Sequence, residues 1–82
     1  MFKNKSITGN NLCGKHISRL RKAHVPKMSQ RMLAEKLQLL GIDMDKNAIQ
    51  RIECGKRFVT DIELLAFSRI FRVSCEDLLK IE

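Results

Sequence analysis

Residues 28–57 read MSQRMLAEKLQLLGIDMDKNAIQRIECGKR, and this stretch decides the fold because it predicts two helices in tandem. The first helix begins behind Ser29 and ends at Gly41, and apolar residues recur along it at helical spacing. The second helix begins at Asp45 and ends at Gly55. The residues expected to form the buried stripe of the first helix are Met32, Leu33, Ala34, Leu37 and Leu40.

The second of these helices, at about residues 45–54, is expected to turn a polar and basic face outward. Ile49 and Ile52 lie on its buried side, and helical steps of three and four residues place the polar side chains on the other side. The outward-facing residues are Lys46, Asn47, Gln50 and Arg51. On a small and basic chain, such a helix favours insertion into the major groove of DNA. An ordinary solvated helix face is the alternative interpretation.

Residue types at the helix ends support these boundaries. Ser29 and Asp45 are N-cap residues, because their side-chain oxygens accept a hydrogen bond from a free backbone N–H of the first turn. Gly41 and Gly55 suit the left-handed conformation that commonly ends a helix.

A further helix is predicted before this pair, over about residues 12–24. Cys13, Ile17 and Leu20 recur at helical spacing and form its buried stripe. Residues 1–11 are polar and lack periodicity, so they are expected to be a flexible basic leader. The remainder, residues 12–82, is expected to form one domain.

Two more helices are predicted after the pair, which makes five in an all-α fold. One spans about residues 60–71, with Thr60 and Glu63 as a capping box. A short one opens at Ser74 and contains Leu78 and Leu79. The residues expected to face inward from the longer helix are Ile62, Leu65, Ala66 and Ile70.

The charge of the chain is strongly positive and unevenly distributed. Of its 82 residues, 16 are Lys or Arg and 9 are Asp or Glu, which gives a formal net charge of +7. Residues 1–57 hold 13 of the basic and 4 of the acidic side chains, a charge of +9, and residues 58–82 carry −2. The field around the helix pair therefore attracts polyanions such as nucleic acid.

The three cysteines predict no disulfide framework and no metal centre. Cys13, Cys54 and Cys75 are odd in number and widely spaced, which fits reduced thiols in a cytoplasmic protein. His16 and His24 lie near Cys13, but no fourth ligand stands at a recognised zinc spacing. No stretch has the roughly 20 apolar residues that a membrane span needs. No cofactor and no membrane partner are expected.

Several fragments resemble the XRE-type helix-turn-helix family of phage repressors and Cro proteins. In chain order they are Ile17-x-x-Leu20-Arg21, Met28-Ser29-Gln30-x-x-Leu33-Ala34-Glu35-Lys36-Leu37, Ala48-Ile49-Gln50-Arg51-Ile52-Glu53-x-Gly55-Lys56-Arg57, Thr60-Asp61-x-Glu63-Leu64-Leu65-Ala66 and Val73-Ser74-x-Glu76-Asp77-Leu78-Leu79. The resemblance covers nearly everything after residue 11. It implies a five-helix lambda-repressor-like domain that binds double-stranded DNA sequence-specifically as a transcriptional regulator. Repression by a homodimer on two half-sites about 34 Å apart is the expected form.

The resemblance also implies roles for individual residues. Lys46, Asn47, Gln50 and Arg51 match recognition-helix positions that face bases or the adjacent backbone. Gln30, Lys56 and Arg57 match positions that contact phosphate. Arg21 and Glu53 match a partly buried salt bridge that joins the first helix to the recognition helix.

This chain departs from the common family pattern in two connections. The turn between the first two helices is about two residues longer, and residues 38–43 make the next connection longer by about five. Gln38 stands where many members have the glycine of a tight turn, so the second helix is expected to continue to Gly41. The depth at which the recognition helix docks is therefore less fixed by the resemblance.

Two other classes of function compete with DNA regulation. A protein-interaction module, as in antitoxin or antirepressor systems, would use the last two helices with Phe58, Phe67 and Phe71. These phenylalanines are expected to belong to the core, because small helical domains need large apolar fillers. An enzyme is not expected, because the glycines are scattered and no nucleophile–base pair or carboxylate cluster is apparent. RNA binding lacks an aromatic stacking platform.

Overall fold

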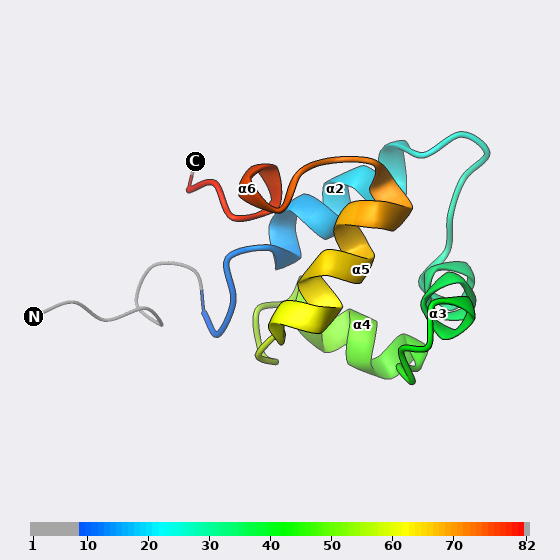
Figure 1. Cartoon of the computed structure of the whole chain (residues 1–82), viewed down its shortest axis with the longest axis horizontal. Coiled ribbons are helices and arrows are strands. Elements are labelled where there is room, and N and C mark those ends of the chain that lie inside the picture. Colours follow the sequence, from blue (N-terminus) through cyan, green and yellow to red (C-terminus); the bar gives the residue numbers. More distant parts are fainter. Residues whose placement is uncertain (1–8, 82) are drawn as a thin grey trace, which may run out of the picture.

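Five helices follow one another in the part of the chain that the structure describes. The computed structural model describes residues 9–81. The helices are α2 (Gly14–Ala23), α3 (Gln30–Leu39), α4 (Lys46–Glu53), α5 (Asp61–Phe71) and α6 (Cys75–Leu78). Residues 9–81 contain no strand, and the helices form a compact all-α globule (Figure 1). The predicted fold class is confirmed at this level.

Side-chain caps begin four of these helices at the predicted residues. The capping residues are Ser29 for α3, Asp45 for α4, Thr60 for α5 and Ser74 for α6. Glu63 completes the predicted capping box, because its carboxylate accepts a hydrogen bond from the Thr60 backbone N–H. Gly41 and Gly55 have φ angles of 84° and 78°, the left-handed conformation expected where α3 and α4 end.

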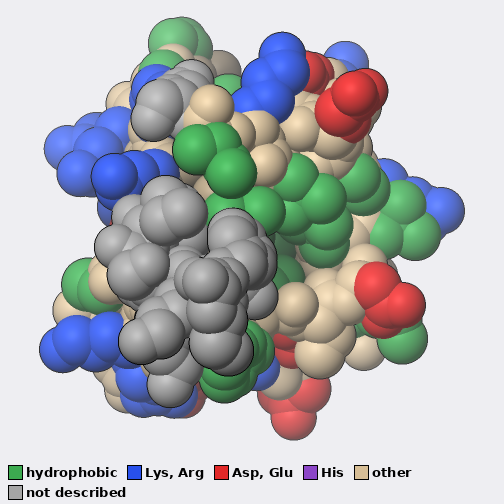
Figure 2. All heavy atoms as spheres, turned by 90° about the vertical axis from the view of Figure 1, so that its left-hand side faces the viewer, with side chains coloured by type: hydrophobic (Ala, Val, Ile, Leu, Met, Phe, Trp, Pro, Cys, Tyr) green, Lys and Arg blue, Asp and Glu red, His purple; other side chains and the backbone are tan. Residues whose placement is uncertain are grey.

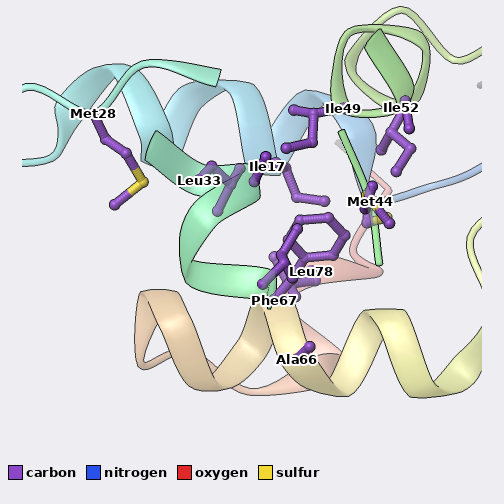
Figure 3. Packing of buried hydrophobic residues seen from close by; sticks show 13 residues of the cluster. Ile17, Met28, Leu33, Met44, Ile49, Ile52, Ala66, Phe67 and Leu78 are labelled. Atoms are coloured by element: carbon purple, nitrogen blue, oxygen red, sulfur yellow. The ribbon is translucent and has the colours of Figure 1, made fainter. Parts of the chain in front are cut away.

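The core lies where α2, α3 and α4 meet α5 and α6. Phe67 points from α5 toward the other helices, beside Leu78 of α6 and below Ile17 of α2 (Figure 3). Leu33 of α3 and Ile49 of α4 are also fully buried. The members of this core are Cys13, Ile17, Met28, Leu33, Ala34, Leu37, Met44, Ala48, Ile49, Ile52, Ala66, Phe67 and Leu78.

The prediction that Met32 and Leu40 belong to the core is wrong. Met32 is 40% exposed, because it lies one helical step to the side of Leu33 on the flank of the buried stripe. Leu40 is 45% exposed, because it is the C-cap residue and the chain turns away through Gly41. Ile42 packs against the core after this turn.

The predicted inward face of α5 is also partly wrong. Ile62 is 66% exposed and Leu65 is 46% exposed, whereas Ala66 and Phe67 are buried. Residues 62–67 of α5 are nearly all apolar, so periodicity alone does not select a side, and the large ring of Phe67 takes the core position. Phe58, which was expected in the core, is 67% exposed.

The arrangement leaves one side of α4 at the edge of the molecule. Helix α4 packs against α2 and α3, and α5 packs against α3 and α6. In Figure 1, α4 runs along the lower edge while α6 lies at the upper left. Every helix within residues 9–81 is too short or too polar to cross a lipid bilayer.

Part of the predicted leader is held against the end of α4. The backbone N–H of Asn10 donates to the Gly55 carbonyl at 2.8 Å, and the Asn11 side chain donates to the Arg57 carbonyl at 2.8 Å. Residues 9–11 therefore belong to the folded unit, because their amides complete the exit of α4. The rest of the predicted leader, residues 1–8, lies outside the described residues.

Candidate nucleic-acid interface

The outer side of α4 carries the side chains that the sequence singles out. Lys46, Asn47, Gln50 and Arg51 are all exposed, whereas Ala48, Ile49 and Ile52 are at most 7% exposed. Within residues 9–81 neither Lys46 nor Arg51 forms an ion pair. The hydrogen-bonding groups of this face are therefore presented to solvent.

Lys46 occupies a position that is unfavourable for the helix itself. It is the first residue of α4, where the helix dipole is positive, and the first turn contains no acidic residue. A cation there costs about 0.3–1 kcal/mol at low ionic strength. The N-cap Asp45, whose Oδ1 accepts from the Ala48 N–H at 2.8 Å, offsets this cost. A positive side chain is thus kept where an anion outside the molecule can meet it.

A buried ion pair fixes α4 against α2. Arg21 Nε donates to Glu53 Oε2 at 2.7 Å and Arg21 Nη2 donates to Glu53 Oε1 at 2.9 Å. The two side chains are only 10% and 8% exposed. Arg21 Nη1 also donates to the Met28 carbonyl at 3.2 Å, which ties in the segment before α3. The hydrogen bond with Glu53 raises the pKa of Arg21 further above its ordinary value.

Gln30 joins the same network from α3. Its Nε2 donates to Glu53 Oε1 at 3.0 Å, and the residue is half-buried. This bond uses one of the two amide hydrogens, so one donor and the carbonyl oxygen are left. Gln30 is therefore a strut between α3 and α4 that also keeps capacity for an outside contact.

Lys56 and Arg57, which follow α4, lie in different surroundings. Lys56 is exposed and forms no ion pair within the described residues. Arg57 donates to the two oxygens of Glu63 at 2.9 and 3.1 Å and to the Phe58 carbonyl at 3.0 Å. Its guanidinium is committed to α5, so of the two only Lys56 is wholly free to meet a phosphate.

The Arg57–Glu63 pair was not expected from the sequence. Six residues across a loop is not a helical spacing, so no periodic signal indicates it. Hydrogen bonding to Arg57 is the main cause that holds the pKa of Glu63 below its ordinary value. Glu63 thereby serves the capping box of α5 and the exit of α4 together.

Asn11 is the second contributor that the sequence interpretation missed. Its Oδ1 accepts from the Gly14 N–H at 2.7 Å, at the start of α2, where the N-cap residue Cys13 makes no side-chain cap. Its Nδ2 donates to the carbonyls of Ile52 at 3.1 Å and Arg57 at 2.8 Å. The available signal was the preference of asparagine for helix starts and turns, just before the apolar stripe of α2.

No metal-binding arrangement is found among the described residues. No group of three or more His, Cys, Asp and Glu side chains within residues 9–81 is placed to hold an ion. Cys54 is exposed beside α4, and Gln50 Nε2 donates to its Sγ at 3.5 Å. The polar groups of this face suit hydrogen bonding to an outside partner.

Comparison of the chain with protein-family models, curated proteins and solved structures found no match.

Proposed function

We propose that this chain binds double-stranded DNA sequence-specifically, with α4 in the major groove, and acts as a transcriptional regulator. The observation that supports it is the construction of α4. One side is buried, its end is fixed by the Arg21–Glu53 pair, and the other side offers exposed amide and cationic groups. A rigid helix with such an edge matches the width of the major groove.

The four exposed side chains have the chemistry for reading bases. Asn47 and Gln50 carry amides that pair in a bidentate way with adenine, and Arg51 carries a guanidinium that does so with guanine. Each good pair supplies about 1–3 kcal/mol of discrimination against a wrong base. Lys46 at the start of α4 reaches a base edge or the adjacent backbone.

Phosphate contacts would fix the register of α4 without reading sequence. Lys56 is the first candidate, because it is exposed and unpaired after α4. Gln30 is the second, since it begins α3, whose positive dipole end suits a phosphate. Arg57 is the third candidate, although Glu63 largely balances its charge while the two remain paired.

The finer family assignment is part of the same proposal. The five-helix order and the resemblance support an XRE-type, lambda-repressor-like domain with a lengthened connection between α3 and α4. Such a domain acts as a homodimer on half-sites about 34 Å apart, and it represses by excluding polymerase from the promoter.

A protein-interaction module is the second candidate, and one observation favours it. Phe58, Ile62 and Leu65 are 67%, 66% and 46% exposed; Ile62 and Leu65 stand three residues apart on one side of α5, and Phe58 lies in the loop before that helix. Hydrophobic side chains also gather near the middle of the face drawn in Figure 2. An exposed apolar patch commonly marks a protein contact. It would serve a partner of an antitoxin or antirepressor system, or the second subunit of a homodimer.

Selection of bound duplexes from a random pool tests the first candidate against the second. We expect the unmodified protein to enrich a palindromic sequence, and the enrichment to fall as the salt concentration rises. Arg51→Ala should weaken binding and relax the preference at one base pair of each half-site. Enrichment of no sequence at either low or high salt would contradict the proposal and favour the interaction module.

A further inference from the structure

The segment before α2 donates hydrogen bonds to consecutive backbone carbonyls just after α4. The Asn10 N–H donates to the Gly55 carbonyl at 2.8 Å, and Asn10 Nδ2 donates to the Lys56 carbonyl at 3.0 Å. Asn11 Nδ2 donates to the Arg57 carbonyl at 2.8 Å. Three neighbouring carbonyls, at residues 55, 56 and 57, are therefore satisfied by two asparagines more than forty positions earlier in the chain.

Two glycines make room for these contacts. A Cβ at Gly14 would lie 2.1 Å from the Ile52 carbonyl oxygen, and a Cβ at Gly9 would lie 2.6 Å from the Gly55 carbonyl oxygen. Both distances are to backbone atoms, which cannot rotate away as a side chain does. The start of α2 and the end of α4 can approach this closely only because these positions lack side chains. We call residues 9–14 the clasp.

Asn11 makes the central contacts of the clasp. Its side chain uses both amide hydrogens and its oxygen, in bonds to Ile52, Arg57 and Gly14. It therefore couples the start of α2, the last turn of α4 and the loop after α4 in one group. The Lys56 N–H in that loop donates back to the Arg51 carbonyl at 2.8 Å, which closes the end of α4.

We propose that Asn11 is a positioning residue for DNA binding. By fixing the loop after α4, it holds Lys56 at the height along α4 where the ammonium group meets the phosphate backbone while Arg51 faces the bases. This inference rests on the proposed function, and it adds to that function a determinant outside the helix pair. Asn11 itself touches no base in this account.

A double-mutant cycle separates positioning from general stability. Lys56→Ala, Asn11→Ala and the double variant are compared for binding to a mixed-sequence duplex of about 20 base pairs between 50 and 200 mM salt. In the otherwise unmodified protein, Lys56→Ala should lower the steepness of salt dependence by about one unit. In the Asn11→Ala background it should lower it by less than half a unit, because the lysine is no longer held in place. Gln38→Ala, which removes an exposed amide on α3, is the matched control and should leave the Lys56 effect intact.

Amide hydrogen exchange in the free protein tests the clasp itself. Asn11→Asp keeps the acceptor for the Gly14 N–H but removes both donors to the carbonyls of Ile52 and Arg57. Exchange at the Lys56 amide should accelerate about tenfold, while the amides of α3 should not change. This variant also serves if Asn11→Ala fails to fold at the assay temperature, because its salt dependence can enter the same cycle.

Different outcomes would overturn the positioning role of Asn11 and the proposed DNA binding. If the unmodified protein binds and Lys56→Ala has the same effect on the salt dependence in both backgrounds, the positioning role of Asn11 is wrong. Unchanged exchange at Lys56 in Asn11→Asp also contradicts it. If the unmodified protein binds no duplex at low salt, the proposed function fails, and the positioning role fails with it.

Discussion

Glu53 is the residue that ties α4 to the rest of the domain. It accepts hydrogen bonds from Arg21 of α2 and from Gln30 of α3, although it belongs to α4. The Glu53 side chain is only 8% exposed, so water solvates its carboxylate poorly. These donors replace water and stabilise the buried negative charge. Three helices thus meet at one carboxylate.

Glu53→Ala should destabilise the fold markedly, because it leaves the Arg21 guanidinium buried without a counter-charge. The cost of breaking a buried pair in this way is about 3–5 kcal/mol. Urea denaturation measures it. Glu35→Ala is the control, since Glu35 pairs with Arg31 at 4.0 Å with side chains 66% and 81% exposed. That variant should lose less than about 0.5 kcal/mol. Equal losses in the two variants would show that Glu53 is no strut.

Glu63 makes the stability of the domain depend on pH. The Arg57 guanidinium is the first cause that holds the pKa of this carboxyl below its ordinary value, and the Thr60 backbone N–H adds to it. A carboxyl whose pKa is lower in the folded state stabilises it above the ordinary pKa. The contribution is lost as the pH falls through the lowered value.

Comparing Glu63→Gln with the unmodified protein isolates this contribution. The glutamine keeps an oxygen for the capping box but has no charge for Arg57. The difference in melting temperature should be constant near neutral pH and shrink as the pH falls below about 4.3, the ordinary pKa of glutamate. A difference that does not change between pH 7 and pH 3 would mean that the charge of Glu63 adds no stability.

For individual residues, the sequence predicts contacts and exposure where the residues follow a repeating pattern or a family motif. Arg21 and Glu53 form the ion pair that the resemblance implies, and the exposed residues of α4 follow from helical spacing. Asn11 and the Arg57–Glu63 pair did not follow, because loop contacts depend on where the chain turns in space. No periodicity in the sequence encodes that.

Among the elements, α4 is too short to be stable alone. It has eight residues, and isolated helices of fewer than about 12–15 residues are marginal in water. Its stability comes from the buried side chains, the Asp45 cap, and the close approach of α2 at Gly14. The position of α4 is therefore set by its neighbours.

Gly14→Ala tests the close approach of α2 to α4. The added Cβ would meet the Ile52 carbonyl oxygen, so α2 must move away, at a cost of about 1–3 kcal/mol in the free energy of unfolding. Binding to a mixed-sequence duplex should weaken as well. Gly41→Ala is the control: no atom lies within 4 Å of its Cβ, and its φ of 84° is strained for alanine. It should lose stability without losing affinity. If Gly14→Ala changes neither the free energy of unfolding nor duplex binding, the close approach of α2 to α4 is required for neither.

Helix starts were easier to predict than buried faces. The caps at Ser29, Asp45 and Thr60 were correct because capping is a local interaction of a few neighbouring residues. The buried face of α5 was partly wrong, because Ile62 and Leu65 compete with Phe67 for the core and only tertiary packing decides among them.

At the scale of the whole molecule, charge is unevenly distributed along the chain. Residues 1–57 carry a formal charge of +9 and residues 58–82 carry −2. On the face in Figure 2, most basic side chains lie toward the left, with others at the top and the right edge, and the acidic ones lie toward the right and the bottom. Such an asymmetric charge would attract a polyanion to the basic part of the chain before contact.

The three thiols report which part of the molecule a duplex covers. Cys54 is exposed at the end of α4 and Cys75 is half-buried in α6. Burial raises the pKa of the Cys13 thiol to about 11, so it is almost wholly protonated and unreactive at pH 8. An excess of duplex at low salt should slow alkylation of Cys54 severalfold and leave the rate at Cys75 unchanged. Peptide mass mapping after a short pulse of iodoacetamide measures both rates. Equal protection of the two thiols would point to non-specific coating.

The most direct test of the claim that α4 reads DNA is an NMR titration of the ¹⁵N-labelled protein with a duplex. The duplex is the one enriched by selection from the random pool, or a mixed-sequence duplex if none is enriched. We predict that the largest backbone shifts occur at Lys46, Asn47, Gln50, Arg51 and Lys56, and that the exposed amides of α6 barely move. Shifts concentrated around Phe58, Ile62 and Leu65, or no shifts at low salt, would contradict the claim that α4 reads DNA.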